Sequence, residues 1–344
     1  MTVFWLASLG VGVVTAILAA ILIPFGNRLK LVDEPFVAAR KVHKKPIPLI
    51  GGLAIAASVI LGLVCAAAYV PELVPVLSME KWSALIAATV VIFAFGTMDD
   101  RMNLSPRIQI LGPIIASLIA AGSGIVVGNV TNPLGGVISF SQMPFVAGAL
   151  TFCWLMGMMY STKLLDGLDG LSTGLSGIAA LMIFALTQTS RFYEPRIGFA
   201  AIIFAGACFG FLLVNFHPAR AFLGEGGSLF VGFAIAILSI LSGSKIATAL
   251  IVMGLPVIDV ARVIISRRLR GHPIFKGDDQ HLHHLLLANG LSHRAAVLFY
   301  YVVGSSLGVL ALFLQSKGKI IVLAALVILA VALAFVLRYR RAHL

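Results

Sequence analysis

Two aspartates three residues apart form the stretch of this sequence best suited to chemistry. Asp166 and Asp169 belong to residues 163–171, between two strongly apolar stretches of a chain with few charges. If this stretch opens a helix, both carboxylates lie on one face. Gly167 and Gly170 would let a phosphate or a neighbouring helix approach the backbone. A polar turn between membrane helices is the simpler interpretation, but we favour a functional site because ionisable groups at the edge of a bilayer are costly.

Two further loops offer groups for a metal-bound phosphate. Asp99 and Asp100 end an apolar stretch, and adjacent acids at a helix end can reach one divalent cation or a cation-bound diphosphate. Residues 224–228 form a glycine-rich turn around Glu225 that enters another apolar stretch. Such a turn suits phosphate, since backbone N–H groups and a helix N-terminus would point at it.

A histidine-rich loop and a basic loop complete the polar candidates. His281, His283 and His284 suit a diphosphate or a nucleotide. A zinc site is the alternative, although no cysteine shares the loop and the spacing matches no common zinc pattern. Lys41 and His43 lie in a basic stretch that, taken alone, is best explained as the flank of a membrane helix.

The composition indicates which elements must position these groups. Hydrophobic residues make up 60% of the 344 residues and charged residues only 11%, with a mean hydropathy of +1.05. We therefore expect an all-α polytopic membrane protein, with residues 1–344 as a single integral-membrane domain. The candidate spans number about eleven: 3–25, 48–71, 83–98, 108–128, 145–163, 171–190, 197–216, 227–243, 246–265, 294–314 and 320–337. Residues 129–144 fit a short hairpin outside the membrane.

The distribution of charge predicts how the chain lies in the membrane. With the N-terminus outside and the C-terminus in the cytoplasm, 19 of the 25 lysines and arginines fall on the cytoplasmic side, in keeping with the positive-inside rule. All eight histidines and ten of the thirteen acidic residues share that side. The rule does not account for histidines and acids, so we expect an active site at the cytoplasmic face. The net charge of +12 then matches anionic lipid and substrate, and we expect no nucleic-acid partner.

Together these groups suit phosphoryl transfer at the boundary between membrane and cytosol. One substrate would be a soluble nucleotide diphosphate and the other a lipid held in the bilayer. For such a transfer a protein mainly positions the reactants and neutralises charge. Two non-enzymatic alternatives stay open: a lipid-binding membrane scaffold, and a transporter, whose ionisable groups should lie near the bilayer midplane with related half-repeats.

The candidate groups fall into motifs that together resemble one known family. In chain order the motifs are Lys41-x-His43, Gly51-Gly52, Asp99-Asp100-Arg101-x-x-Leu104-Ser105-Pro106, Asp166-Gly-Leu-Asp169-Gly-Leu, Asn215-Phe-His-Pro-Ala219, Gly224-Glu-Gly-Gly-Ser228, Asp259 and His281-Leu-His283-His284. From about residue 31 to 294 the chain resembles the polyprenyl-phosphate N-acetylhexosamine-1-phosphate transferases, glycosyltransferase family 4. The resemblance implies transfer of a sugar-1-phosphate, foremost GlcNAc-1-phosphate, from a UDP-sugar to undecaprenyl phosphate. UMP would be released, and Mg²⁺, or Mn²⁺ in its place, would be the cofactor.

The resemblance also implies a cellular setting. It predicts a multi-pass enzyme of the bacterial cytoplasmic (inner) membrane, acting in the first membrane step of a cell-envelope polysaccharide such as O-antigen, common antigen or teichoic acid. The His-x-His-His form resembles the UDP-N-acetylglucosamine branch; phospho-MurNAc-pentapeptide transferase activity or another UDP-HexNAc donor is the alternative. The expected partners are the UDP-sugar donor, the lipid acceptor and the membrane, and a homodimer is left open.

Individual roles follow from the resemblance as well. Asp99 and Asp100 would sit near the diphosphate, one of them deprotonating or orienting the lipid phosphate, and Asp166 and Asp169 would organise the uridine and phosphate side. Covalent attack by an aspartate is the alternative to direct displacement, which we favour because a lipid phosphate is already an anionic nucleophile. Asp100 and Glu225 would bind the metal. The substrate-binding positions would be Lys41, His43, Lys163, Asn215, Gly226, Ser228, His281, His283 and His284.

Three residues depart from the family pattern. Lys163 stands where an asparagine is usual, Glu225 where an aspartate is usual, and Pro113 where a glutamine is usual. A charged lysine cannot bind a metal, whereas glutamate reaches one methylene further than aspartate and still can. We expect the first two substitutions to be paired, with Lys163 neutralising diphosphate charge and Glu225 keeping the metal.

Overall fold

The fold is almost entirely helical, as the composition predicts. The structure is a computed structural model that describes residues 1–34, 46–132, 136–243, 246–271 and 280–343. Within these ranges the helices are α1 Thr2–Arg28, α2 Gly51–Tyr69, α3 Met79–Met102, α4 Pro106–Gln109, α5 Leu111–Gly122, α6 Pro144–Leu165, α7 Leu171–Thr187, α8 Pro195–Asn215, α9 Glu225–Leu241, α10 Ile246–Val252, α11 Gly254–Leu269, α12 Leu282–Ala288, α13 His293–Phe313 and α14 Ser316–His343. The strands are β1 Val32–Asp33, β2 Ile47–Pro48, β3 Asn129–Thr131 and β4 Val137–Ser139.

Many of these helices can cross a membrane. In the described part of the chain, seven are long and apolar enough: α1, α2, α3, α6, α8, α13 and α14. The count becomes eight if α10 and α11, which meet at a bend of 78°, form one span. The remaining predicted spans coincide with the shorter apolar segments Pro106–Gly122, α7 and α9. The prediction of an all-α polytopic membrane protein is therefore confirmed, whereas the total of eleven crossings stays a prediction.

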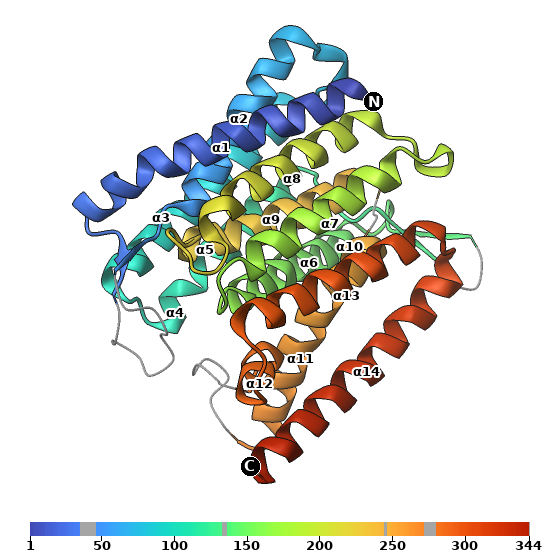
Figure 1. The fold of residues 1–344 in the computed structure, drawn as a ribbon. Helices are drawn as coiled ribbons and strands as arrows, with labels where there is room; N and C mark the ends of the chain where they lie inside the picture. Colours follow the sequence, from blue (N-terminus) through green and yellow to red (C-terminus); the bar gives the residue numbers. More distant parts are fainter. Residues whose placement is uncertain (35–45, 133–135, 244–245, 272–279, 344) are drawn as a thin grey trace.

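Helices α7, α8 and α9 form the centre of the bundle (Figure 1). In α8, 78% of the most apolar segment is buried within the protein, whereas the other six long helices bury between 17% and 39%. Helix α8 packs against α1 and α7, and α9 packs against α3 and α6. The buried residues of α7 include Ser172, Gly174 and Ser176. Small residues of this kind let helices approach closely inside a bilayer.

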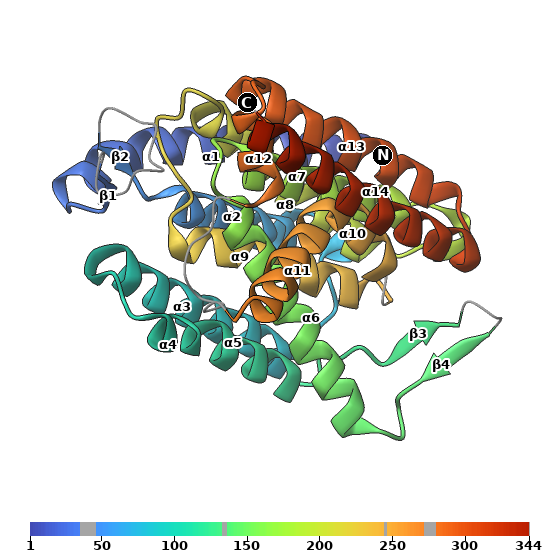
Figure 2. The same cartoon turned by 90° about the horizontal axis from the view of Figure 1, so that it is seen from below.

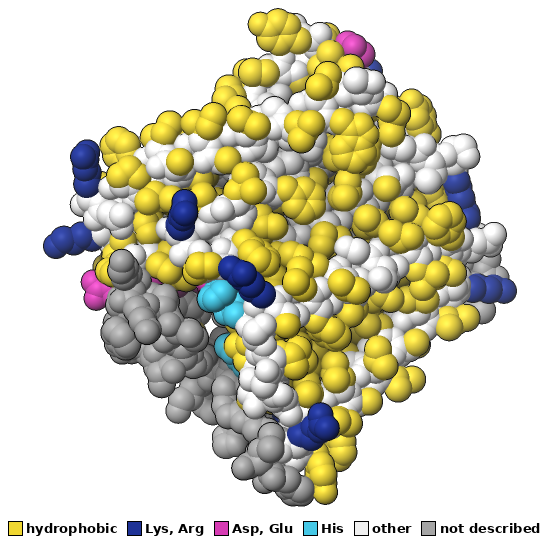
Figure 3. All heavy atoms as spheres, in the orientation of Figure 1, with side chains coloured by type: hydrophobic (Ala, Val, Ile, Leu, Met, Phe, Trp, Pro, Cys, Tyr) yellow, Lys and Arg dark blue, Asp and Glu magenta, His cyan; other side chains and the backbone are white. Residues whose placement is uncertain are grey.

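The outer helices turn apolar side chains outward. Figure 3 shows a face made mostly of hydrophobic side chains, with a few scattered lysines and arginines. The exposed apolar residues include Leu9, Val13 and Ile17 on α1 and Ile328 on α14. An apolar surface of this extent is suited to contact with lipid chains rather than with water.

Two pairs of short strands lie between the helices. Strands β3 and β4 are antiparallel, which confirms the strand pair predicted within residues 129–144, and Figure 2 shows this pair projecting beyond the helices. Strands β1 and β2 are also antiparallel. Just after β2, the backbone of Phe222 donates to the carbonyl of Pro48 at 2.9 Å and accepts from the N–H of Gly51 at 2.9 Å. These bonds tie the start of α2 to the loop that precedes α9.

Close backbone contacts fix the N-terminal end of α9. A Cβ atom added to Gly96 in α3 would lie 2.2 Å from both Cα and N of Gly226. A Cβ atom added to Gly52 in α2 would lie 2.1 Å from Cα of Gly227. The first turn of α9 therefore touches α2 and α3 backbone to backbone, and only glycine permits this distance. Two of the glycines in the 224–228 turn serve helix packing.

We expect Gly96→Ala to destabilise the folded protein. The added methyl group would overlap the backbone of α9, and overpacking typically costs about 1–3 kcal/mol. The apparent unfolding temperature of the detergent-solubilised protein should fall, as measured by the fraction that stays monodisperse after heating. Gly148→Ala in α6 is the matched control, because a Cβ atom there would meet nothing within 4 Å. Equal unfolding temperatures for the two variants would contradict the close contact.

Candidate active site

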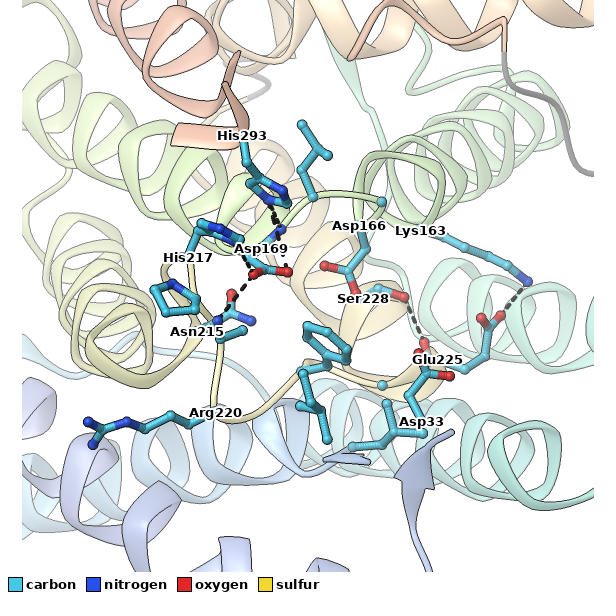
Figure 4. Close-up of a pocket in the computed structure, with 18 of the residues that line it drawn as sticks. Asp33, Lys163, Asp166, Asp169, Asn215, His217, Arg220, Glu225, Ser228 and His293 are labelled. Carbon is cyan, nitrogen blue, oxygen red and sulfur yellow. Dashed lines mark hydrogen bonds and ion pairs between the residues drawn. The ribbon is translucent and has the colours of Figure 1, made fainter. Parts of the chain in front are cut away.

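The ends of several helices surround one cavity of ≈ 890 Å³. The C-terminal ends of α3, α6 and α8 and the N-terminal ends of α9 and α13 contribute to its wall. Figure 4 shows Asp166, Asp169 and Glu225 reaching this space from two different segments of the chain. Asp100 lines the same cavity. The structure thus brings together four acids from three distant segments of the chain, and their catalytic and metal-binding roles stay predictions.

Asp166 and Asp169 lie in the turn that joins α6 to α7. Helix α6 ends at Leu165 and α7 begins at Leu171, so the two acids do not share a helix face. The interpretation as a polar turn is therefore right for the backbone. Gly170 has a φ of +81°, a left-handed conformation that glycine adopts without strain, and it leads the chain into α7. Both carboxylates nevertheless line the cavity.

Negative charge is in excess on one side of the cavity. Lys163 forms an ion pair with Glu225, and Asp100 accepts the backbone N–H of Glu225 at 3.1 Å. The carboxylate of Asp166 makes no hydrogen bond to any residue that the structure describes. Burial, followed by the charges of Glu225 and Asp169, raises the pKa of Asp166 well above its ordinary value. Carboxylate oxygens are the ligands that Mg²⁺ prefers, so this under-compensated set fits a divalent cation.

Asp169 is held by two histidines to which the sequence analysis assigned no role. Its Oδ2 atom accepts from Nδ1 of His217 at 2.7 Å and from the N–H of Ala219 at 3.1 Å. Its backbone N–H donates to Nε2 of His293 at 2.8 Å, and the two imidazoles stack with centroids 4.1 Å apart. His217 lies within the recognised motif of residues 215–219. Nothing in the sequence pointed to His293, which meets Asp169 across 124 positions of the chain.

The hydrogen bonds among Asp169, His217 and His293 occupy the ring nitrogens that could otherwise bind a metal. Their ligand atoms lie within 4.8 Å of one another. However, Nε2 of His293 already accepts a backbone N–H, and Nδ1 of His217 is bonded to Asp169. A ring nitrogen needs a free lone pair to bind a metal. The contacts instead fix the ring of His217 at the cavity wall, where Asp169 and His293 also lie.

Asp99 is not among the described residues that line the cavity. Its Oδ1 atom accepts from the N–H of Leu104 at 2.8 Å and from Nε2 of Gln109 at 2.9 Å. The other amide atom of Gln109, Oε1, accepts from Nζ of Lys163 at 3.3 Å. Among the described residues, Asp99 is therefore linked to the cavity through Gln109 and Lys163, and its predicted place beside the diphosphate has no support from a cavity contact.

The histidine-rich loop is anchored by Asp259, which is 4% exposed. One carboxylate oxygen of Asp259 accepts from Nδ1 of His281 at 2.9 Å, and the other pairs with Arg262 at 2.6 Å. His283 is buried beside Gly167, and burial, with the nearby His284 and His281, lowers its pKa well below the ordinary value. His284 alone of the three predicted histidines lines the cavity. Substrate contacts by His281 and His283 stay predictions.

The remaining predicted residues have varied surroundings. Asn215 lines the cavity but is 1% exposed, and its amide bonds to Thr173 at 2.7 Å and to the carbonyl of Ala221 at 2.9 Å. Ser228 lines the cavity, whereas Gly226 is buried at the helix contacts described above. Lys41 and His43 lie outside the described residues. Asp33 and Ile47, in the strand pair that brackets them, line the cavity.

Comparison with known proteins matches this site to a family. Residues 82–243 match the family described as glycosyl transferase family 4. The chain is 32% identical over 321 residues to a probable undecaprenyl-phosphate N-acetylglucosaminyl 1-phosphate transferase of Bacillus subtilis, covering 91% of this chain and 84% of that protein. It is 30% identical to the decaprenyl-phosphate N-acetylglucosaminephosphotransferase of Mycobacterium leprae, covering 86% and 80%.

A third relative carries a different activity in its name. The chain is 29% identical to a phospho-N-acetylmuramoyl-pentapeptide-transferase of Halalkalibacterium halodurans, over 88% of this chain and 94% of that protein. All three relatives align along most of their length, and the family match spans the two aspartate motifs and the 224–228 turn. On this agreement of motifs, cavity and extended similarity, the chain belongs to glycosyl transferase family 4, the superfamily of polyprenyl-phosphate N-acetylhexosamine-1-phosphate transferases.

Proposed function

We propose that this enzyme transfers GlcNAc-1-phosphate from UDP-GlcNAc to undecaprenyl phosphate and releases UMP. The observation that carries the proposal is the convergence of Asp100, Asp166 and Glu225 on one cavity at the ends of apolar helices. Such a site can be reached both by a soluble diphosphate and by a lipid headgroup. The names of two relatives, which specify N-acetylglucosamine with undecaprenyl or decaprenyl phosphate, support the choice of substrates.

Two alternatives concern the donor. A relative named as a phospho-N-acetylmuramoyl-pentapeptide-transferase keeps that activity as one alternative. The unusual pair of Lys163 and Glu225 beside the cavity keeps another UDP-HexNAc donor as the second. Like the donor, the polysaccharide that the product enters has several alternatives: O-antigen, common antigen or teichoic acid.

The acids supply a site for the Mg²⁺ ion of the proposed reaction, with Mn²⁺ as a substitute. Asp100, Asp166 and Glu225 would hold the ion. When bound, a divalent cation neutralises charge on the diphosphate and on the phosphoryl group in transfer. The protein prepares this site by bonding Asp100 to the first N–H of α9 and by leaving the carboxylate of Asp166 without a hydrogen-bond donor among the described residues.

We favour direct displacement as the chemical step. An oxygen of the lipid phosphate forms a bond to the sugar-bearing phosphorus of the donor. The bond from that phosphorus to the bridging oxygen breaks, and UMP departs with the electron pair. Asp169 is engaged by His217 and Ala219, which supports an orienting role rather than nucleophilic attack. The charge that develops in such a transfer is spread over phosphoryl oxygens, so positioning and neutralisation supply most of the rate.

The proposed topology places the cavity at the cytoplasmic face of the bacterial inner membrane. The positive-inside distribution supports an outer N-terminus, an inner C-terminus and eleven crossings. The seven long helices, the bent pair of α10 and α11, and the shorter Pro106–Gly122, α7 and α9 supply eleven apolar segments in the described part of the chain. A soluble UDP-sugar would then meet its lipid acceptor on the side where nucleotide sugars are made.

Loss of a cavity carboxylate should abolish most of the activity. Purified wild-type enzyme should convert radiolabelled UDP-GlcNAc and undecaprenyl phosphate into a lipid-linked product and UMP. We expect Asp100→Asn and Asp166→Asn each to lower turnover by at least about a hundredfold, the scale of one lost transition-state electrostatic contact. Glu80→Gln is the matched control, because Glu80 is an exposed acid at the far end of α3. Near-normal turnover in either aspartate variant would remove that residue from the site.

Thiol labelling tests the proposed orientation. Ser105 and Ser139 are both exposed and lie on opposite sides in the proposed topology. In a variant that lacks Cys65, Cys153 and Cys208, Ser139→Cys should react with a membrane-impermeant maleimide in cells with an intact inner membrane. Ser105→Cys should react only after that membrane is permeabilised. The reverse pattern would invert the topology, and equal labelling would place both residues on one side.

A double-mutant cycle tests whether Asp169 acts together with His217. The two residues share a hydrogen bond of 2.7 Å, and members of one network are strongly non-additive. We expect Asp169→Asn and His217→Ala each to lower turnover, and the double variant to be no worse than the poorer single variant within about threefold. Strictly multiplicative losses would show that the two residues act independently.

A further inference from the structure

We propose that Lys163 is a built-in counter-ion that competes with the divalent cation for Glu225, and that Asp99 and Gln109 hold it there. Lys163 would thereby keep the free enzyme's affinity for the metal low and let the ion bind tightly only together with the diphosphate. The inference rests on the proposed function for the identity of the diphosphate. It assigns Asp99 and Gln109 as positioning residues rather than catalytic ones.

The ion pair is enclosed by the protein. The side chains of Lys163 and Glu225 are each only 18% exposed, and the ring of Tyr160 lies 5.6 Å from the ammonium group. A lysine in such surroundings loses much of its hydration, so its interaction with the carboxylate is stronger than that of a surface pair. Glu225 therefore has a partner before any metal arrives.

Hydrogen bonds to Gln109 determine which of its amide atoms faces the lysine. Its Nε2 atom donates to Oδ1 of Asp99 at 2.9 Å and to the carbonyl of Leu104 at 2.9 Å. Both N–H groups of the amide are thus used, and the opposite orientation would place the carbonyl oxygen against two acceptors. Oε1 of Gln109 must then face Lys163, and the distance from this atom to Nζ of Lys163 is 3.3 Å. Asp99 in this way fixes a second acceptor for the ammonium group.

The charges explain what this arrangement does. The cavity lining includes Lys163 and Arg220 against five acids, Asp33, Asp100, Asp166, Asp169 and Glu225, so carboxylates outnumber the lysine and arginine side chains, and Lys163 is the one that pairs with Glu225. A divalent cation that approaches Glu225 must displace or face the ammonium group at close range, which weakens its binding. A diphosphate supplies new negative charge for Lys163, and Glu225 is then released to the ion. Metal and diphosphate should bind with positive coupling, a reciprocal relation between the two ligands.

Binding of Mn²⁺ to the full-length protein in detergent, followed by electron paramagnetic resonance, tests the proposal without turnover. We expect Lys163→Met to bind Mn²⁺ at least about tenfold more tightly than the wild type, and Lys163→Arg, which keeps the charge, to stay near the wild type. UDP should tighten Mn²⁺ binding in the wild type and much less in Lys163→Met. Lys317→Met removes an exposed lysine at the start of α14 and is the matched control. Unchanged Mn²⁺ affinity in Lys163→Met would overturn the proposal.

Two variants of Asp99 separate positioning from catalysis. Asparagine keeps an oxygen that accepts from Gln109, so Asp99→Asn should retain the wild-type Mn²⁺ affinity and lose less than about tenfold in turnover, far less than Asp100→Asn. Asp99→Ala removes the acceptor and should tighten Mn²⁺ binding several-fold, because Lys163 is then held less firmly. A loss of turnover in Asp99→Asn as large as that in Asp100→Asn would make Asp99 a catalytic residue and overturn its positioning role.

Failure of the proposed function would look different. The Mn²⁺ titrations use neither sugar donor nor lipid acceptor. If the wild type forms no lipid-linked sugar while Lys163→Met still tightens Mn²⁺ binding, the choice of reaction is wrong and the counter-ion role stands. If the wild type is active and the Mn²⁺ affinities of wild type and Lys163→Met are equal, the counter-ion role is wrong and the reaction stands.

Discussion

The contact between backbones at the start of α9 is the constraint on which the site depends. Gly226 and Gly227 let α2 and α3 approach this helix so closely that a single methyl group would overlap the backbone. The approach brings Asp100 within hydrogen-bond distance of the first N–H of α9. It also carries Glu225 to the cavity, where the α6–α7 turn supplies Asp166. A site whose acids come from three distant segments is thus assembled by packing inside an apolar bundle.

That assembly places several carboxylates close together, and the protein neutralises their negative charge only in part. Charge in a poorly hydrated site is expensive unless it is paired, and Lys163 and Arg220 are outnumbered by the five acids that line the cavity. Acids that are held close together, partly shielded from water and under-compensated favour the binding of a cation and of the anion that accompanies it. The same property that makes the apo site costly therefore provides a physical basis for binding a metal-bound diphosphate.

The sequence predicted the helical membrane fold and the strand pair correctly, because apolar runs and turn residues are local signals. Its motifs also named four acids that line the cavity, Asp100, Asp166, Asp169 and Glu225, but they included Asp99, which does not line it, and gave no role to Asp33, which does. It misjudged the backbone of Asp166 and Asp169, since three-residue spacing occurs in turns as well as in helices. The roles of Gln109 and His293 could not be found, because each depends on a contact between residues far apart in the chain.

The length of the central helices has a consequence for how a lipid reaches the site. Helices α7 and α9 have 17 residues each, or about 26 Å at 1.5 Å per residue, whereas the hydrocarbon layer is about 30 Å thick. Helices of this length that cross a bilayer leave their polar ends below the membrane surface. If α9 crosses the bilayer, its first turn, whose Glu225 and Ser228 line the cavity, then lies below the layer of lipid phosphates. A lipid anchored by a long chain can present its headgroup sideways, without being lifted out of the bilayer.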